Sequence, residues 1–219
     1  MILIEMNGFL KILKKVINPI IVFNKICNLL YKSYDAFFFH HFGKGALILR
    51  PIIRISGKKY IDIGDACFIG KNARIEAIYR YNEKYYSPSI VIGSNVCINQ
   101  NFHCTCASSV IIGKGTSITA NCGIFDIVHP YMDIELNPRM ADIKAIPVVI
   151  GEDCLIGMNS VLLPGTTLGD HCVVGANSTL SSNYPSYTVI VGSPAKIVRR
   201  YCFEKRFWRK TDSQGNFID

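Results

Sequence analysis

The sequence lacks the long apolar run that a membrane-spanning helix needs. The best candidate, Phe9 to Tyr31, is interrupted by four lysines, three asparagines and a proline, whereas a span requires about 20 mostly apolar residues. The segment is instead typical of an amphipathic helix broken near Asn18-Pro19. Two interpretations stay open, because a Lys-rich helix of this kind can lie on an anionic membrane or cap the open end of a protein core.

Charged residues are scarce, at 18% of the chain against 49% hydrophobic residues, and this balance excludes a disordered chain. Acidic residues are outnumbered 16 to 24 by basic ones, and the net charge of +8 favours an anionic partner. The first ten residues lack the basic start and cleavage site of a secretory leader. We therefore expect a cytoplasmic protein with reduced cysteines, with the N-terminal segment as the candidate for contact with the inner membrane face.

Several catalytic and binding motifs are missing. The stretch Gly113-Lys114-Gly115-Thr116 has Ser108 where a phosphate-binding loop needs glycine, and no G-x-S-x-G motif is present. His103, Cys104 and Cys106 do not share one face of a strand, so we expect no metal site there. Nucleic-acid binding would rest on net charge alone, and we expect none.

The sequence does contain a repeat of six residues. In the C-terminal half, aliphatic residues recur six apart at Ile150, Ile156, Leu162, Leu168, Val174 and Leu180. Small residues follow four positions later at Cys154, Ser160, Thr166, Cys172 and Ser178. Shorter runs with the same pattern begin at Ile63, Ile92 and Ile112. Repeats of this kind indicate stacked units that share one continuous core.

A period of six predicts one short strand and one turn on each face of a three-sided coil, with the aliphatic and small side chains inside. The fold class is therefore an all-β parallel β-helix. The glycine after many of the aliphatic residues is expected to provide a turn with positive φ. A β-sandwich is disfavoured because its turns would recur every 8–12 residues or so.

With this repeat, the chain resembles the hexapeptide-repeat acyltransferases over roughly residues 60 to 200, and most closely those that O-acetylate sugars and surface polysaccharides. The resemblance implies a left-handed coil, acetyl-CoA as co-substrate, and a homotrimer with active sites between subunits. We expect an N-terminal helical segment at 1–45, a β-helix acyltransferase domain at 46–198 and a short tail at 199–219.

His129 is the predicted catalytic residue. The segment Phe125-Asp126-Ile127-Val128-His129-Pro130 interrupts the repeat and resembles the catalytic His-Pro of the family. An imidazole suits the task, since a base must take the proton of the acceptor hydroxyl. Asp126 is assigned to the acceptor side, either orienting the imidazole or serving as a turn residue.

The acceptor is expected to contact Asn101, because Asn101-Phe102 resembles an Asn-Phe pair of sugar acetyltransferases; an asparagine stacked in a turn is the alternative. His103 is either a second acceptor contact or an ordinary repeat residue. The segment Ala77 to Pro88 carries four tyrosines, which suit either a sugar ring or a subunit contact. The loop Tyr131 to Pro147 follows the catalytic position and is predicted to gate it.

The coenzyme side is predicted from the closing motif of the family, which Gly192 to Arg200 resembles. Lys196 and Arg199 match its phosphate-binding positions. The remaining predicted coenzyme contacts are Met158, Ala176, Ser181 and Ser182, although Met158 replaces a common serine and the two serines replace a common Thr-Lys.

The predicted function is transfer of an acetyl group from acetyl-CoA to a saccharide hydroxyl by direct attack. Two alternatives stay open. One is N-acetylation of a nucleotide-linked amino sugar on the same scaffold, and the other is a β-helical scaffold without enzymatic activity.

Overall fold

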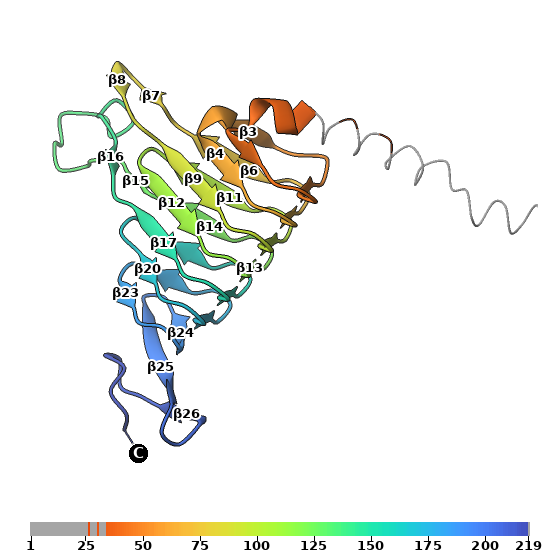
Figure 1. The fold of residues 1–219 in the computed structure, drawn as a ribbon. Helices are drawn as coiled ribbons and strands as arrows, with labels where there is room; N and C mark the ends of the chain where they lie inside the picture. Colours follow the sequence, from red (N-terminus) through yellow and green to blue (C-terminus); the bar gives the residue numbers. More distant parts are fainter. Residues whose placement is uncertain (1–25, 27–29, 31–33, 219) are drawn as a thin grey trace, which may run out of the picture.

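The computed structural model describes residues 26, 30 and 34–218, and most of them wind into a three-sided β-helix (Figure 1). Sheet A contains β1 (His41–Phe42), β4 (Ile61–Ile63), β9 (Ser89–Ile92), β12 (Ser109–Ile112), β17 (Val148–Ile150), β20 (Thr167–Leu168) and β23 (Asn183–Tyr184). Sheet B contains β2 (Leu47–Ile48), β5 (Phe68–Ile69), β10 (Cys97–Ile98), β13 (Ser117–Ile118), β18 (Leu155–Ile156), β21 (Val173–Val174) and β24 (Thr188–Gly192), followed by β25 (Ala195–Cys202) and β26 (Phe207–Lys210). Sheet C contains β3 (Arg54–Ser56), β6 (Arg74–Ala77), β11 (His103–Cys106), β14 (Gly123–Phe125), β19 (Val161–Leu162) and β22 (Thr179–Leu180).

The chain passes from sheet A to B to C in each coil, and strands of successive coils pair in parallel. The antiparallel pairs β24–β25 and β25–β26 extend sheet B past the last coil. The predicted parallel coil of hexapeptide repeats is thus confirmed, while its left-handedness stays a prediction from the resemblance.

The core consists of the predicted aliphatic residues, stacked in register. On sheet B the stack runs through Ile69, Ile98, Ile118, Ile156, Val174 and Ile190, each at most 2% exposed. The predicted small residues Cys154, Ser160, Thr166, Cys172 and Ser178 are equally buried. Burial of each large aliphatic side chain stabilises the fold by roughly 1.5–3 kcal/mol.

The expectation that the glycine after each aliphatic residue provides a positive φ is wrong. Glycines that follow the aliphatic residues, such as Gly93 and Gly157, are not among the positive-φ residues. A Cβ on Gly157 would lie 2.5 Å from the backbone nitrogen of Ala176 in the next coil, and one on Gly93 would lie 2.7 Å from that of Lys114. Glycine is therefore needed for close approach of successive coils, and the left-handed residue comes two positions later, as at Asn159 with φ 61°.

Two insertions interrupt the coil, both between a strand of sheet C and the next strand of sheet A. We call this edge the C–A corner. The first insertion is the antiparallel hairpin of β7 (Arg80–Tyr81) and β8 (Lys84–Tyr85). The second is a loop closed at its neck by the antiparallel pair β15 (Ile127–Val128) and β16 (Lys144–Ala145). The two insertions lie side by side in Figure 1.

The described part of the N-terminal segment packs on the first coil. Residues 34–38 are helical, and Asp35 within them is buried and forms ion pairs with Arg50 and Lys58, each at 2.9 Å. The helix predicted over Phe9 to Tyr31 lies outside the described residues apart from positions 26 and 30. Within the described part, no helix combines the length and hydropathy needed to cross a membrane.

The strands run past both expected domain boundaries. β1 already pairs with β4 before residue 46, and β25 continues across 198/199.

A 3-10 helix, η1 (Lys58–Tyr60), precedes β4.

Candidate functional site

His129 lies at the C–A corner, directly after β15, and its side chain is exposed. Its imidazole packs edge-on against the ring of Tyr81 from the β7–β8 hairpin, with ring centroids 5.6 Å apart. The predicted base therefore stands where the repeat is interrupted, between the two insertions. An exposed imidazole of this kind is open to an incoming hydroxyl.

The hairpin holds the loop that follows His129. Tyr81 donates from its hydroxyl to the carbonyl of Arg139 at 2.7 Å, and Tyr86 donates to that of Ile143 at 3.0 Å. The amide of Asn82 donates to the carbonyl of Met140 at 3.0 Å. Three side chains of the tyrosine-rich segment thus organise the loop that the sequence predicts to gate the site.

Asp126 is fully buried three residues before His129. Its Oδ1 accepts the backbone N–H of Ala107 at 2.8 Å, and its Oδ2 accepts that of Ser108 at 2.7 Å. Its own carbonyl accepts the N–H of Ile146 at 2.7 Å, which closes the neck of the loop. The carboxylate therefore caps the turn of the preceding coil and fixes the point from which the chain leaves for His129. The expected contact of Asp126 with the acceptor stays a prediction.

Asn101 belongs to a ladder of asparagine side chains at the turns from sheet B to sheet C, which we call the B–C corner. Its Nδ2 donates to Oδ1 of Asn121 at 2.8 Å, and its Oδ1 accepts from Nδ2 of Asn72 at 3.1 Å. The ladder continues through Asn159 to Asn177. Sequence reasoning left open a stacked turn asparagine, and this is the environment that the structure gives Asn101. One amide hydrogen and one lone pair stay free of the ladder for an acceptor.

Asn101 and His129 lie at opposite edges of sheet C. Five residues of extended chain separate the two corners in one coil, for example from Asn121 to Asp126, which corresponds to about 16 Å. A single chain therefore does not bring the predicted acceptor amide and the predicted base together.

His103 lies on the outer face of sheet C. Its Nε2 is 3.1 Å from Oγ1 of Thr105, and its ring packs edge-on against Phe125 with centroids 5.0 Å apart. Burial, with a smaller contribution from Arg74, lowers the pKa of His103. This favours the neutral ring.

Cys104 and Cys106 lie on the same strand as His103. Burial is the main cause that raises the pKa of both thiols, with a further contribution from Asp126. Buried thiols held in the protonated form are poor metal ligands. Among residues 34–218, no three His, Cys, Asp or Glu side chains form a group that could hold a metal ion.

The predicted coenzyme residues fall into two places. Met158 and Ala176 are exposed neighbours in successive coils at the B–C corner. On β25, exposed Lys196 pairs with Val191 beside Gly175, and exposed Arg199 pairs with Val189. The register places Lys196 on the side of the B–C corner, where Met158 and Ala176 lie, and Arg199 beside an earlier residue of β24. Ser181 and Ser182 are instead exposed at the C–A corner of the last complete coil.

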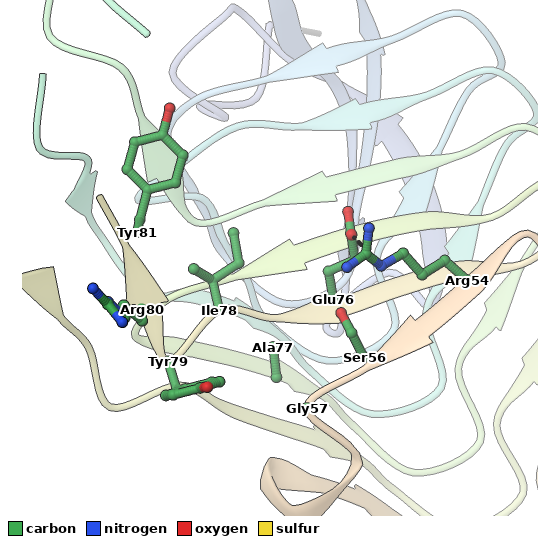
Figure 2. A pocket seen from close by; sticks show the side chains of 9 residues that line it. All are labelled: Arg54, Ser56, Gly57, Glu76, Ala77, Ile78, Tyr79, Arg80 and Tyr81. Carbon is green, nitrogen blue, oxygen red and sulfur yellow. Dashed lines mark ion pairs between the residues drawn. The ribbon is translucent and has the colours of Figure 1, made fainter. Parts of the chain in front are cut away.

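Sequence reasoning missed a charged cavity beneath the hairpin. Figure 2 shows its walls, with Arg54 and Glu76 on one side and Tyr79, Arg80 and Tyr81 on the other. The cavity encloses about 280 Å³. Arg54 and Glu76 are next to the inward-pointing Ile55 and Ile75 of the repeat. Alternation could therefore have marked both charged residues as outward, but not as facing a cavity.

The chain is similar in sequence to known acyltransferases. The pattern of the family described as hexapeptide repeat of succinyl-transferase matches residues 60–78 and 147–182. The chain is 31% identical over 192 residues to WbbJ of Escherichia coli K12, which is named as an O-acetyl transferase of lipopolysaccharide biosynthesis, covering 84% of this chain and 94% of WbbJ. It is 30% identical over 132 residues to the galactoside O-acetyltransferase of the same organism, covering 60% and 62% of the two chains.

The fold is also shared with solved structures. One is a hexapeptide-repeat-containing acetyltransferase of Vibrio cholerae in complex with acetyl coenzyme A. It is 26% identical, has a TM-score of 0.53, and the match covers 77% of this chain and 74% of the other.

Proposed function

Since this chain belongs to the hexapeptide-repeat acyltransferase family and is an acetyl-CoA-dependent acyltransferase, we propose that it transfers the acetyl group to a hydroxyl of a saccharide that forms part of a surface polysaccharide or its precursor. The observation that carries the proposal is the placement of His129. It is exposed at the corner where two insertions replace the repeat, and Tyr81 packs against its ring. The similarity to two O-acetyltransferases supports a hydroxyl rather than an amine as acceptor.

The proposed reaction is a single direct displacement. One ring nitrogen of His129 takes the proton from the acceptor hydroxyl while the oxygen attacks the thioester carbonyl. The resulting tetrahedral intermediate collapses as the C–S bond breaks, and the leaving thiolate takes the proton back from the imidazolium. The products are an acetyl ester and free coenzyme A, and no covalent enzyme intermediate is needed when both substrates are held together.

Acetyl-CoA fits the residues proposed to hold it. Its phosphates are anionic, and exposed Lys196 and Arg199 on β25 are the matching cations. Ala176 and Met158 offer a small and a flexible apolar surface along the B–C corner for the pantetheine arm. Ser181 and Ser182, at the C–A corner, are also proposed to contact the coenzyme.

We also infer that the active site forms between copies in a homotrimer. Within one chain, Met158 and Ala176 lie at the far edge of sheet C from His129, about 16 Å away by strand length. A neighbouring copy that presents its B–C corner to His129 would bring donor and base together. The loop after His129 exposes Tyr131, Met132, Ile134 and Met140, and apolar surface of this kind supports contact with another copy.

The test compares three variants with the wild type, measuring acetyl transfer to saccharide fragments and, by calorimetry, binding of acetyl-CoA. His129→Ala is expected to lower the transfer rate by about 10²- to 10⁴-fold while acetyl-CoA binding is kept. Lys196→Ala/Arg199→Ala is expected to weaken acetyl-CoA binding. His41→Ala, which removes an exposed histidine of β1, is the matched control and should change neither quantity.

Each part of the proposal has its own contrary result. Undiminished transfer by His129→Ala would rule out the histidine base. Faster transfer to amino sugars than to hydroxyls would replace O-acetylation by N-acetylation. No acetyl-CoA binding at millimolar concentration by the folded protein would remove the donor assignment.

A further inference from the structure

The buried carboxylate of Glu76 is shared by two arginines on the outer face of sheet C. Oε2 of Glu76 is 2.6 Å from Nε of Arg74 on the same strand, and Oε1 is 3.3 Å from Nε of Arg54 on the neighbouring strand β3. Glu76 as a whole is 8% exposed. The shorter contact with Arg74 already neutralises the carboxylate, so the charge of Arg54 is in excess.

Arg54 retains most of its hydrogen-bonding capacity. A guanidinium has five N–H donors, and the contact of Arg54 with Glu76 joins Nε to Oε1 at 3.3 Å. The side chain is 65% exposed, so its terminal nitrogens are accessible. Glu76 fixes the guanidinium from behind, which lowers the entropy lost when a ligand binds the open end.

Arg54 lines the 280 Å³ cavity, and Figure 2 shows its guanidinium beside the carboxylate of Glu76. This volume is near the lower limit of roughly 300–1,000 Å³ for small-molecule sites and suits one sugar ring. Tyr79 and Tyr81 line the opposite wall and provide aromatic surface for such a ring.

The cavity is connected to the proposed base through a single side chain. Tyr81 lines the cavity and also packs against the ring of His129. A ligand that lies against Tyr81 in the cavity is therefore next to the corner where His129 is exposed. Arg80, on the same wall, is paired with Glu83 at 2.9 Å, so its charge is compensated while that of Arg54 is not.

We propose that this cavity binds the acceptor saccharide and selects one that carries a negative charge, a phosphate or a carboxylate, which the terminal nitrogens of Arg54 bind. This inference rests on the proposed function, because only acetyl transfer makes the bound sugar an acceptor. The binding of an anionic sugar is argued from the residues of the cavity alone. The substrate class is then an acidic sugar or a sugar phosphate rather than a neutral glycan.

The experiment measures direct binding by calorimetry, without acetyl-CoA, of glucose 1-phosphate, glucuronic acid and glucose. The wild type is compared with Arg54→Gln, which leaves Glu76 its shorter pair with Arg74 and so keeps the carboxylate compensated. Arg54→Lys keeps the charge but removes the planar fork. Lys205→Gln, an exposed site on the C-terminal hairpin, is the control with the same change of net charge.

We expect at least one anionic sugar to bind the wild type 10-fold or more tightly than glucose. Arg54→Gln should weaken that binding by about 10- to 100-fold, in the range of a charge-assisted hydrogen bond, and leave glucose unchanged. Arg54→Lys should be intermediate, and Lys205→Gln should match the wild type. The anion that binds more tightly tells whether phosphate or carboxylate is the natural group.

The inference is overturned if glucose binds as tightly as both anions, if none of the three sugars binds, or if Arg54→Gln leaves the anions unaffected. Those results would leave acetyl transfer by His129 intact. Conversely, binding of an anionic sugar through Arg54 without any acetyl transfer would refute the proposed function alone.

Discussion

The two edges of sheet C differ although the same repeat generates both. At the B–C corner the chain takes six residues from one inward residue to the next in each coil that carries the asparagine ladder, as from Ile118 to Ile124 and from Ile156 to Leu162. At the C–A corner the corresponding steps, from Ile75 to Ile92 and from Ile124 to Ile150, contain whole insertions. The first edge repeats one solution, and the second carries the hairpin, the loop, the cavity and His129.

The difference separates what stabilises the coil from what performs chemistry. The B–C corner satisfies its polar groups with an identical asparagine in successive coils, so any one coil there resembles the next. The C–A corner satisfies its polar groups with single side chains that have no equivalent, such as Asp126. Substitutions at the C–A corner should therefore affect function. Substitutions at either corner should lower stability, by an amount that depends on how deeply the substituted residue is buried.

The largest effect is expected from Asp126→Ala. The change leaves the N–H groups of buried Ala107 and half-buried Ser108 without their acceptor, at about 1–3 kcal/mol each, so the free energy of unfolding should fall by roughly 2–6 kcal/mol. Denaturant unfolding gives the value. Asp170→Ala is the matched control, since its Oδ1 also accepts a backbone N–H, from Glu152 at 2.8 Å, but in an exposed turn, and it should cost under about 1 kcal/mol. Equal losses at both sites would show that the C–A corner is no more dependent on its cap than a regular turn.

An intermediate effect is expected from Asn159→Ala in the ladder. The residue has φ 61°, where alanine is disfavoured by about 1–2 kcal/mol, and its amide links Asn121 and Asn177. The free energy of unfolding should fall by roughly 2 kcal/mol. Asn159→Gly removes the same hydrogen bonds but accepts the backbone angle, so it should recover about half of that loss. If glycine is as destabilising as alanine, the hydrogen bonds and not the backbone angle determine the ladder.

The same comparison resolves the role of Asn101. Asn101→Ala should destabilise the fold as much as Asn159→Ala, because both residues are internal members of the ladder with nearly equal φ. If Asn101 also contacts the acceptor, its variant alone raises the KM for the saccharide. An unchanged KM would leave it as a turn residue.

The regular part of the molecule could be predicted from the sequence because the same six-residue pattern recurs in successive coils. Ile150 and its successors at six-residue steps determine which side chains point inward, and the register follows from their equivalence. The ladder was within reach too, since asparagine recurs three residues after Ile69, Ile98, Ile118, Ile156 and Val174.

The C–A corner was not predictable in the same way. The sequence marked His129 through its departure from the repeat, but the path of an insertion is set by single long-range contacts. The bond of Tyr81 to Arg139 joins residues 58 positions apart, and nothing in the local pattern specifies it. For the same reason the sequence did not indicate that the Asp126 carboxylate accepts the backbone N–H groups of Ala107 and Ser108, nor that Glu76 pairs with Arg54.

The smallest effect is expected from Tyr81→Phe, which removes one hydroxyl and keeps the ring beside His129. The lost hydrogen bond to the carbonyl of Arg139 is worth about 0.5–1.5 kcal/mol, and it acts on the loop rather than on the coil. Global stability should therefore change little, while amide hydrogen exchange over residues 131–143 should accelerate by up to about 10-fold. Tyr85→Phe is the control, because its side chain lies on the same hairpin but is 69% exposed. If the loop exchanges at the same rate in both variants, the Tyr81 hydroxyl does not hold it. The proposed contrast between the repetitive B–C corner and a C–A corner held by single contacts would then be wrong.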